Sequence, residues 1–259
     1  MARIPLTPEL DSMVEFANVT MRMPRRRRRR GSGRRQRLRR IAGEARREEI
    51  HVLADLSFRV APGEAVAVLG LNGLARQTLL RLVAGTLRPD SGIIHRRESI
   101  VPMIEVARSF ERTYSIRQNV YLVGGLLGMT PAQVEQHFPA IVEKSGVTIP
   151  VDRYLGAAPA LVRQKLAWSI AMSVDAKAYA IDRTIVVGDE PFRQECWAHV
   201  EGLRDEGATF IIATDAPKQI RHFCTRGLVF SDGRLVADAE IVEAIDAARE
   251  FRKQAKDTG

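Results

Sequence analysis

The feature that most constrains the fold of this chain is a glycine-containing segment, Gly70-Leu71-Asn72-Gly73-Leu74-Ala75-Arg76-Gln77-Thr78, which separates two apolar stretches. Residues 64–69 before it predict a buried strand, and residues 79–85 after it predict a helix that stops at a glycine. A strand, a glycine loop and a helix form the context in which backbone N–H groups hold phosphates. The segment therefore predicts a phosphate-binding loop or, as the plainer alternative, a tight strand-to-helix turn.

Three positions of this segment depart from the P-loop pattern, which has Gly, Lys and Ser or Thr where the chain has Ala75, Arg76 and Gln77. Ala75 would be strained by about 1 kcal/mol if its φ were positive. Arg76 keeps a positive charge on a wider, planar group, and the amide of Gln77 suits octahedral Mg²⁺ geometry poorly. Thr78 still offers a hydroxyl one position later. We expect weakened nucleotide binding and little ATPase activity.

The positive charge of the chain, +9 over 259 residues, comes from a single tract. Thirteen arginines and one acid lie between Arg25 and Arg47, so the tract carries +12 and the remainder −3. Cys196 and Cys224 form no C-x-x-C pair, which is typical of buried thiols in a reducing cytosol. No signal peptide is evident, and the longest weakly charged apolar stretch, 120–129, is too short to cross a bilayer. These features favour a cytoplasmic protein that is soluble or peripheral to a membrane.

Strands that alternate with helices predict an α/β fold with an added antiparallel part. The patterns predict strands over 13–19, 53–60, 64–69, 93–105, 178–182 and 208–214, a hairpin over 228–236, and helices over 116–147, 161–174, 192–206 and 241–256. Thr130 and Pro131 have the N-cap and first-turn chemistry of a helix start. We expect an irregular tail over 1–12, one domain over 13–238, and a C-terminal helix over 239–259. Within that domain we expect an arginine-rich loop at 24–49 and a helical subdomain at about 116–174.

Several short segments, in this order and spacing, resemble the ATP-binding subunits of ABC transporters, and more narrowly those that energise export of capsular and related cell-surface polysaccharides. The segments are 79–85 followed by Arg88-Pro89-Asp90-Ser91-Gly92, 117–122 with 127–129, 187–189 with 192–196, and 222–224 with 228–230. The resemblance covers about residues 13–238. It implies a P-loop NTPase-like nucleotide-binding domain, ATP and Mg²⁺ as ligands, and a membrane permease as partner at the inner face of the cell membrane.

The resemblance also implies roles for individual positions, and most of these positions carry a changed residue. The nucleotide would lie on residues 70–78 and on Asp182, the Walker B aspartate, with Gln77 and Asp182 as a weak Mg²⁺ site. The other positions are Arg183 for the catalytic glutamate, Asp215 for the switch histidine, Glu105 for the Q-loop glutamine, Pro159-Ala160-Leu161-Val162 for the signature, Asp189 for the D-loop aspartate, and Met23 near the adenine-stacking aromatic.

These changes point to a loss of catalysis. Arg183 cannot accept a proton from water, and losing a positioned base lowers a rate by about 10²–10⁴. Leu161 places a bulky side chain where backbone should approach phosphate, and Asp215 places a negative charge opposite a negative γ-phosphate. Because the Walker and signature changes share one chain, neither a homodimer nor a pair with an intact paralogue has an intact site. We hypothesise a pseudo-ATPase with a structural or regulatory role.

Alternatives stay open for the function and for the tract. The chain could be a weak but genuine ATPase that uses another carboxylate such as Glu190, or a non-transport scaffold. The tract Arg25–Arg47 is typical of a solvated loop, of a segment that binds anionic lipid, or of a segment that binds polyanions. The lack of interleaved aromatics argues against sequence-specific recognition of nucleic acid. A permease would bind near Glu105–Asn119.

Overall fold

The computed structural model describes residues 11–24, 49–183, 187–214, 217 and 220–257. The strands are β1 (Val14–Pro24), β2 (Glu49–Val60), β3 (Ala65–Leu69), β4 (Ser91–Arg96), β5 (Val101–Met103), β6 (Ala178–Asp182), β7 (Thr209–Ala213), β8 (Arg226–Ser231) and β9 (Arg234–Glu240). The helices are α2 (Gly73–Val83), α3 (Ile116–Leu126), α4 (Pro131–Ser145), α5 (Ala160–Met172), α6 (Glu190–Asp205) and α7 (Ile241–Asp257), with short 3-10 helices η1 (Val106–Ser109) and η2 (Leu155–Ala157).

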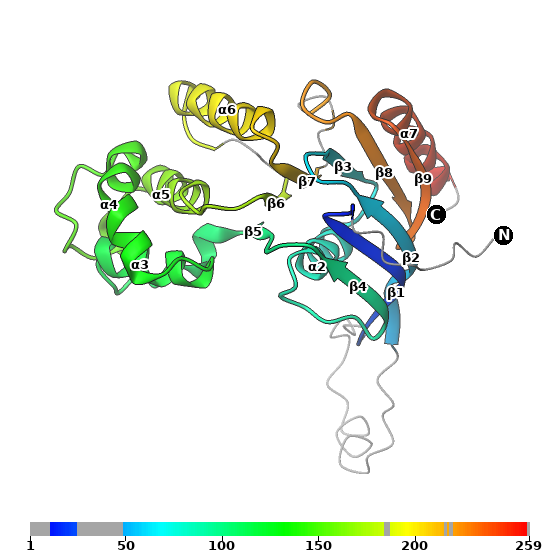
Figure 1. Ribbon diagram of the computed structural model, residues 1–259, viewed down its shortest axis with the longest axis horizontal. Coiled ribbons are helices and arrows are strands. Elements are labelled where there is room, and N and C mark those ends of the chain that lie inside the picture. The colour runs from blue at the N-terminus through cyan, green and yellow to red at the C-terminus, as the bar shows by residue number, and fades with distance from the viewer. Residues whose placement is uncertain (1–10, 25–48, 184–186, 215–216, 218–219, 258–259) are drawn as a thin grey trace, which may run out of the picture.

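Two sheets organise the fold (Figure 1). The larger has the order β5-β6-β7-β3-β8-β9, in which all neighbours are parallel except the β8–β9 hairpin. The smaller is an antiparallel sheet of order β2-β1-β4. Strand β3 lies inside the larger sheet and leads directly into α2, so the glycine segment lies at the carboxyl edge of the parallel strands.

The alternation of side chains in β3 divides the core into two layers. Ala65, Ala67 and Leu69 pack with α6 and α7 on one face of the larger sheet. Val66 and Val68 pack with α2 and with the smaller sheet on the other face. Successive residues of a strand point to opposite faces, so an all-apolar run such as β3 is what a strand covered on both sides requires.

Helices α3, α4 and α5 form a separate group with its own apolar core, which lies to one side of the sheets in Figure 1. Two capping boxes set helix starts here. Ser115 with Gln118 begins α3, and Thr130 with Gln133 begins α4, where Pro131 occupies the first turn. Helix α4 ends at Gly146, whose φ of 66° suits a glycine cap.

Most of the predicted elements are confirmed, and three predictions differ from the structure. Residues 93–105 do not form one strand, because β4 joins the smaller sheet and β5 the larger one. Strands β1 and β2 are also longer than predicted, and they pair as far as Pro24 and Glu49. Helix α2 begins at Gly73 rather than near residue 79. Of the predicted tail over residues 1–12, residues 1–10 lie outside the described residues, as does the tract Arg25–Arg47. The domain boundaries stay predictions.

Candidate functional site: the carboxyl edge of the larger sheet

Gly70 turns the chain sharply out of β3. Its φ is +86°, and a Cβ added there would lie 2.1 Å from the carbonyl oxygen of Phe230. Both the backbone conformation and the close approach of a neighbouring strand require glycine at this position. The turn starts α2 at the carboxyl end of the sheet, and the helix then packs on the face that carries Val66 and Val68.

The glycine segment is helical from Gly73 onward, which is earlier than the predicted helix start near residue 79. Asn72 is the N-cap of α2, and its Oδ1 accepts a hydrogen bond of 3.0 Å from the N–H of Ala75. The N–H of Arg76 is bonded to the Asn72 carbonyl at 2.9 Å. Two amides that a phosphate loop would present to a ligand are therefore bonded within the protein. Ala75 is helical, so the strain considered for a positive φ does not arise.

Arg76 forms a buried ion pair with Asp182 across the carboxyl edge of the sheet. Its Nε donates to Oδ1 of Asp182 at 2.7 Å, and the two side chains are only 3% and 5% exposed. Arg76 lies near the start of α2, and Asp182 is the last residue of β6. A carboxylate that the sequence predicted for Mg²⁺ is therefore held by a guanidinium of the same chain.

The neighbouring polar side chains of α2 do not converge on this pair. Thr78 is buried, and its hydroxyl donates to the carbonyl of Leu74 one turn earlier at 2.8 Å. Gln77 is half-buried, and Leu74 is 49% exposed. The sequence predicted Thr78 as a phosphate contact and Gln77 as a metal ligand, and the hydroxyl of Thr78 is already bonded to its own helix.

Two positions near the site are strained. Arg183 directly follows β6 with a φ of 67°, is exposed, and donates its N–H to the carbonyl of Ala213 at 2.6 Å. Glu105 has a φ of 50° and accepts a hydrogen bond of 2.6 Å from Arg108. Left-handed conformations of non-glycine residues cluster at functional sites, and both residues occupy positions to which the resemblance assigns a role. Asp215, the predicted switch position, lies outside the described residues.

The signature position forms the start of α5. Pro159 is its N-cap, and no side chain caps the helix there. Leu161 is 41% exposed, whereas Val162 packs against the apolar core of the helical group. The structure thus presents an aliphatic side chain to solvent at the position where the resemblance implies a glycine.

Asp189 forms an ion pair with Lys165 of α5, a residue that the sequence did not single out. The Nζ of Lys165 lies 2.7 Å from Oδ1 of Asp189 and 4.8 Å from the ring centre of Phe192. The hydrogen bond from Lys165 lowers the pKa of Asp189. Gly188 makes room for this arrangement, because a Cβ there would lie 2.8 Å from Phe192. A single sequence gives no indication that residues 165 and 189 meet.

Met23, predicted near the adenine position, pairs with Ile50 in the β1–β2 hairpin and packs against the core beside the smaller sheet. Two hollows among the described residues are lined by residues outside the glycine segment. One of about 200 Å³ is lined by parts of η1 and α3, and one of about 390 Å³ lies beside Lys165 and Asp189. Met23 and the predicted nucleotide residues thus line neither hollow.

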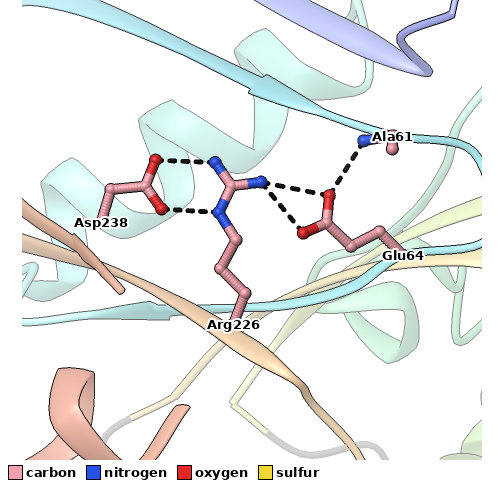
Figure 2. A network of polar contacts seen from close by, with 4 residues as sticks. All are labelled: Ala61, Glu64, Arg226 and Asp238. Carbon is pink, nitrogen blue, oxygen red and sulfur yellow. Dashed lines mark hydrogen bonds and ion pairs between the residues drawn. The ribbon is translucent and has the colours of Figure 1, made fainter. Parts of the chain in front are cut away.

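The opposite, amino edge of the larger sheet holds a second arginine in a different setting (Figure 2). Arg226 donates to both oxygens of Asp238 at 2.5 and 2.7 Å and to both oxygens of Glu64 at 2.9 and 3.2 Å. Glu64 also accepts from the N–H of Ala61. Hydrogen bonds to Asp238 foremost raise the pKa of Arg226. This network joins β3, β8 and β9 and was not predicted from the sequence.

Comparison with known proteins identifies the fold and the family. A family model described as ABC transporter matches residues 53–193, which is more than half of the chain. This chain belongs to the ABC transporter family. The predicted family and the α/β fold with an antiparallel part are thereby confirmed.

The curated relatives of this ABC protein include export subunits. It is 30% identical to the O-antigen export system ATP-binding protein RfbB of Klebsiella pneumoniae over 71% of this chain and 74% of the relative. It is 26% identical to the ABC transporter protein AbcA of Aeromonas salmonicida over 73% of this chain, and 24% identical to the teichoic acids export ATP-binding protein TagH of Bacillus cereus over 79%. The chain spans only 61% and 37% of the length of these last two relatives.

Solved ABC structures share the architecture. An ATP-binding cassette determined as a dimer in a post-hydrolysis state superposes with a TM-score of 0.66 at 16% identity, over 88% of this chain and 99% of that one. The protein cbiO1 of Clostridium perfringens superposes with a TM-score of 0.60 at 17% identity, over 94% of both chains. At this identity the likeness shows the fold alone. In the part of the ABC chain described here, no helix is long and apolar enough to cross a membrane.

Proposed function

We propose that this chain is the ATP-binding-type subunit of an ABC complex that exports a cell-surface polysaccharide, and that it acts as a pseudo-ATPase with a structural or regulatory role. The export assignment is supported by the relatives named for O-antigen and teichoic acid export. The pseudo-ATPase assignment is carried by one observation, the buried pair of Arg76 and Asp182.

ATP and Mg²⁺ are the ligands that the family implies, and the residues at the glycine segment fit them poorly. The Arg76 guanidinium is directed at Asp182 rather than at the space beyond the sheet. A Mg²⁺ ion would have to compete with this cation for the same carboxylate, in a setting with little water to screen the repulsion. The helix start at Gly73 further removes loop backbone that would surround a phosphate chain.

The other altered positions support the same proposal. Arg183 stays protonated at working pH and cannot serve as a general base. Leu161 exposes an aliphatic side chain where a composite site would need close backbone contact with phosphate. Since these changes affect both the Walker and the signature positions, pairing with a second copy does not restore a complete site.

Phosphate release from ATP by the purified protein tests this proposal. We expect no Mg²⁺-dependent turnover above that of Asp182→Asn, with thermal unfolding used to verify that both proteins are folded. A variant with Ala75→Gly, Arg76→Lys and Gln77→Ser restores the loop pattern, and its nucleotide binding should increase. Robust turnover by the natural chain that Asp182→Asn abolishes would contradict the proposal.

The same assay decides the alternative of a weak but genuine ATPase. The observation that favours this alternative is Glu190, whose side chain is 71% exposed and lies 3.7 Å from Arg193, which leaves its carboxylate open to water. If Glu190 acts as a base, slow turnover will be present in the natural chain and absent in Glu190→Gln. We expect neither.

The proposed partner is a membrane permease, which would place the chain at the cytoplasmic face of a membrane. A hollow of about 200 Å³ supports this, because residues of η1 and α3 line it and one of them, Leu126, is 65% exposed. A tagged protein expressed in its native host should co-purify a permease, and Leu126→Asp should abolish this. Val242→Asp on α7, at 46% exposure, is the matched control. Binding of anionic lipid by the tract Arg25–Arg47 stays a separate prediction.

A further inference from the structure

Strand β4 lies at one end of the smaller sheet (Figure 1). It pairs with β1 on one side, and no described strand pairs with its other side. The opposite end of this sheet differs, because the N–H of Ala54 in β2 donates to the carbonyl of Gly233 in the β8–β9 turn at 2.9 Å. An uncovered strand presents backbone donors and acceptors that can pair with another chain. We call the uncovered side of β4 (Ser91–Arg96) the β4 edge.

The β4 edge is suited to pairing with a further strand. The N–H of Arg97, just after β4, donates to the carbonyl of Met13 beside β1 at 3.0 Å. Because backbone groups alternate in direction along a regularly paired strand, those of Ile94 face the β4 edge. Ile93 beside it is 57% exposed, and β4 contains neither the Lys nor the Pro that commonly protects an edge. The side chain of Arg96 is directed away, to a carbonyl at the end of α2.

The sequence around β4 is complementary to itself when two copies are antiparallel and Ile93 lies on the two-fold axis. In this register Ile93 faces its own copy, and residues at equal distances before and after it face each other. Arg88 of one copy then lies near Glu98 of the other, and both side chains are exposed and form no ion pair with a described residue. An axis at Ile94 would instead bring Asp90 near Glu98, which are like charges. The charges therefore favour the register centred on Ile93.

We infer that the β4 edge pairs with the β4 edge of a second copy of this chain, so that two three-stranded sheets join into one. The backbone groups of Ile94 supply interchain hydrogen bonds, and the two Ile93 side chains bury each other. Residues 88–98 carry three arginines and two acids, so a net charge of +1 per copy opposes pairing little. Arg96 marks this surface as lying at the C-terminal end of α2, whereas the glycine segment lies at its start. The inference therefore does not depend on the state of the nucleotide site.

Disulfide cross-linking of the purified full chain tests the pairing and its register. On the two-fold axis the two Cα atoms of residue 93 would lie about 4.5–5.5 Å apart, within the range that a disulfide spans. Ile93→Cys should therefore form a covalent dimer on mild oxidation, whereas Ser91→Cys, whose two copies would lie roughly 14 Å apart, should not. Val242→Cys on α7 is an exposed control, and the natural Cys196 and Cys224 are buried.

Sedimentation analysis of the nucleotide-free protein measures the same association without a covalent bond. We expect a reversible dimer whose dissociation constant rises about tenfold or more in Ile93→Lys, because lysine opposes edge pairing and two lysines would face each other. Val242→Lys, the matched control, should leave the dissociation constant unchanged, and thermal unfolding verifies that each variant is folded. The inference is overturned if the natural chain is monomeric at about 100 μM, if Ile93→Lys dimerises equally well, or if Ser91→Cys cross-links as readily as Ile93→Cys.

Discussion

The larger sheet holds an arginine against a carboxylate at each of its two ends, and the two arrangements differ in burial. At the amino edge Arg226 is 28% exposed and bonds to both oxygens of two carboxylates. At the carboxyl edge Arg76 is 3% exposed, and its Nε bonds to Oδ1 of Asp182. Ligands of open α/β sheets bind beyond the carboxyl ends of the strands. Arg226 therefore holds strands together, whereas Arg76 lies where a ligand would bind.

The largest expected change in the free energy of unfolding comes from breaking the buried ion pair at the carboxyl edge. Asp182→Ala leaves the Arg76 guanidinium buried without this carboxylate and should lower the free energy of unfolding by about 3–5 kcal/mol. The double variant Arg76→Met/Asp182→Leu should be close to neutral, because apolar residues of similar volume can replace a buried pair. Urea denaturation measures both. Equal destabilisation by the single and double variants would show that the pair is not coupled.

The two glycine turns that flank β3 extend the comparison. Gly70→Ala at the carboxyl edge combines a positive φ with overlap on the Phe230 carbonyl and should destabilise by about 2–4 kcal/mol. Gly63→Ala at the amino edge keeps a positive φ of 77°, but its nearest atom is 3.6 Å away, so about 1–2 kcal/mol is expected. The thermal unfolding temperatures of the two variants give their order of stability. The reverse order would mean that the carboxyl edge can relax.

At the amino edge, Arg226→Met should lower the free energy of unfolding by only about 1–2 kcal/mol, because water already reaches this network. Salt should reduce the difference between the natural chain and this variant, since partly exposed charges are screened. The effect of Asp182→Ala should change much less with salt. Urea denaturation at low and high ionic strength measures both dependences, and a salt-independent effect of Arg226→Met would contradict the contrast between the two ends.

The smallest expected effect is a change in the pKa of Asp189. This residue follows β6 in the chain, and its side chain is half exposed. Its pKa is lowered by Lys165 from the ordinary value of 3.8. A lowered carboxyl pKa stabilises the fold above 3.8, and this stabilisation is lost as the pH falls through the lower folded value. Carboxyl carbon shifts in an NMR titration should show the pKa rising toward 3.8 in Lys165→Met and staying low in Lys144→Met. An unchanged value in Lys165→Met would assign the shift to another group.

Local patterns predicted the elements well and the site poorly. The apolar runs at 178–182 and 208–214 predicted β6 and β7, because a strand covered on both faces needs unbroken apolar sequence. The strand prediction over 93–105 failed because periodicity does not reveal that β4 and β5 join different sheets. Asn72 is a residue type that often caps helix N-termini, and this signal for the start of α2 at Gly73 was missed in the sequence.

The decisive contacts of both ends join residues far apart in the sequence. Arg76 and Asp182 are 106 positions apart, and Arg226 and Glu64 are 162 positions apart. The family resemblance placed Arg76 and Asp182 in one site. It identified Arg76 as a replacement of the P-loop lysine and Asp182 as the retained Walker B aspartate. It did not reveal that the two side chains bond to each other, because this depends on the helix start and on burial rather than on residue type.

Calorimetric titration of the purified protein with ATP, with and without Mg²⁺, tests most directly whether the pair of Arg76 and Asp182 closes the site. We expect no binding heat up to about 1 mM ATP for the natural chain, which corresponds to a binding free energy weaker than about −4 kcal/mol. The variant with Ala75→Gly, Arg76→Lys and Gln77→Ser should bind measurably. Binding by the natural chain with a Kd below about 100 μM that strengthens with Mg²⁺ would contradict a closed site.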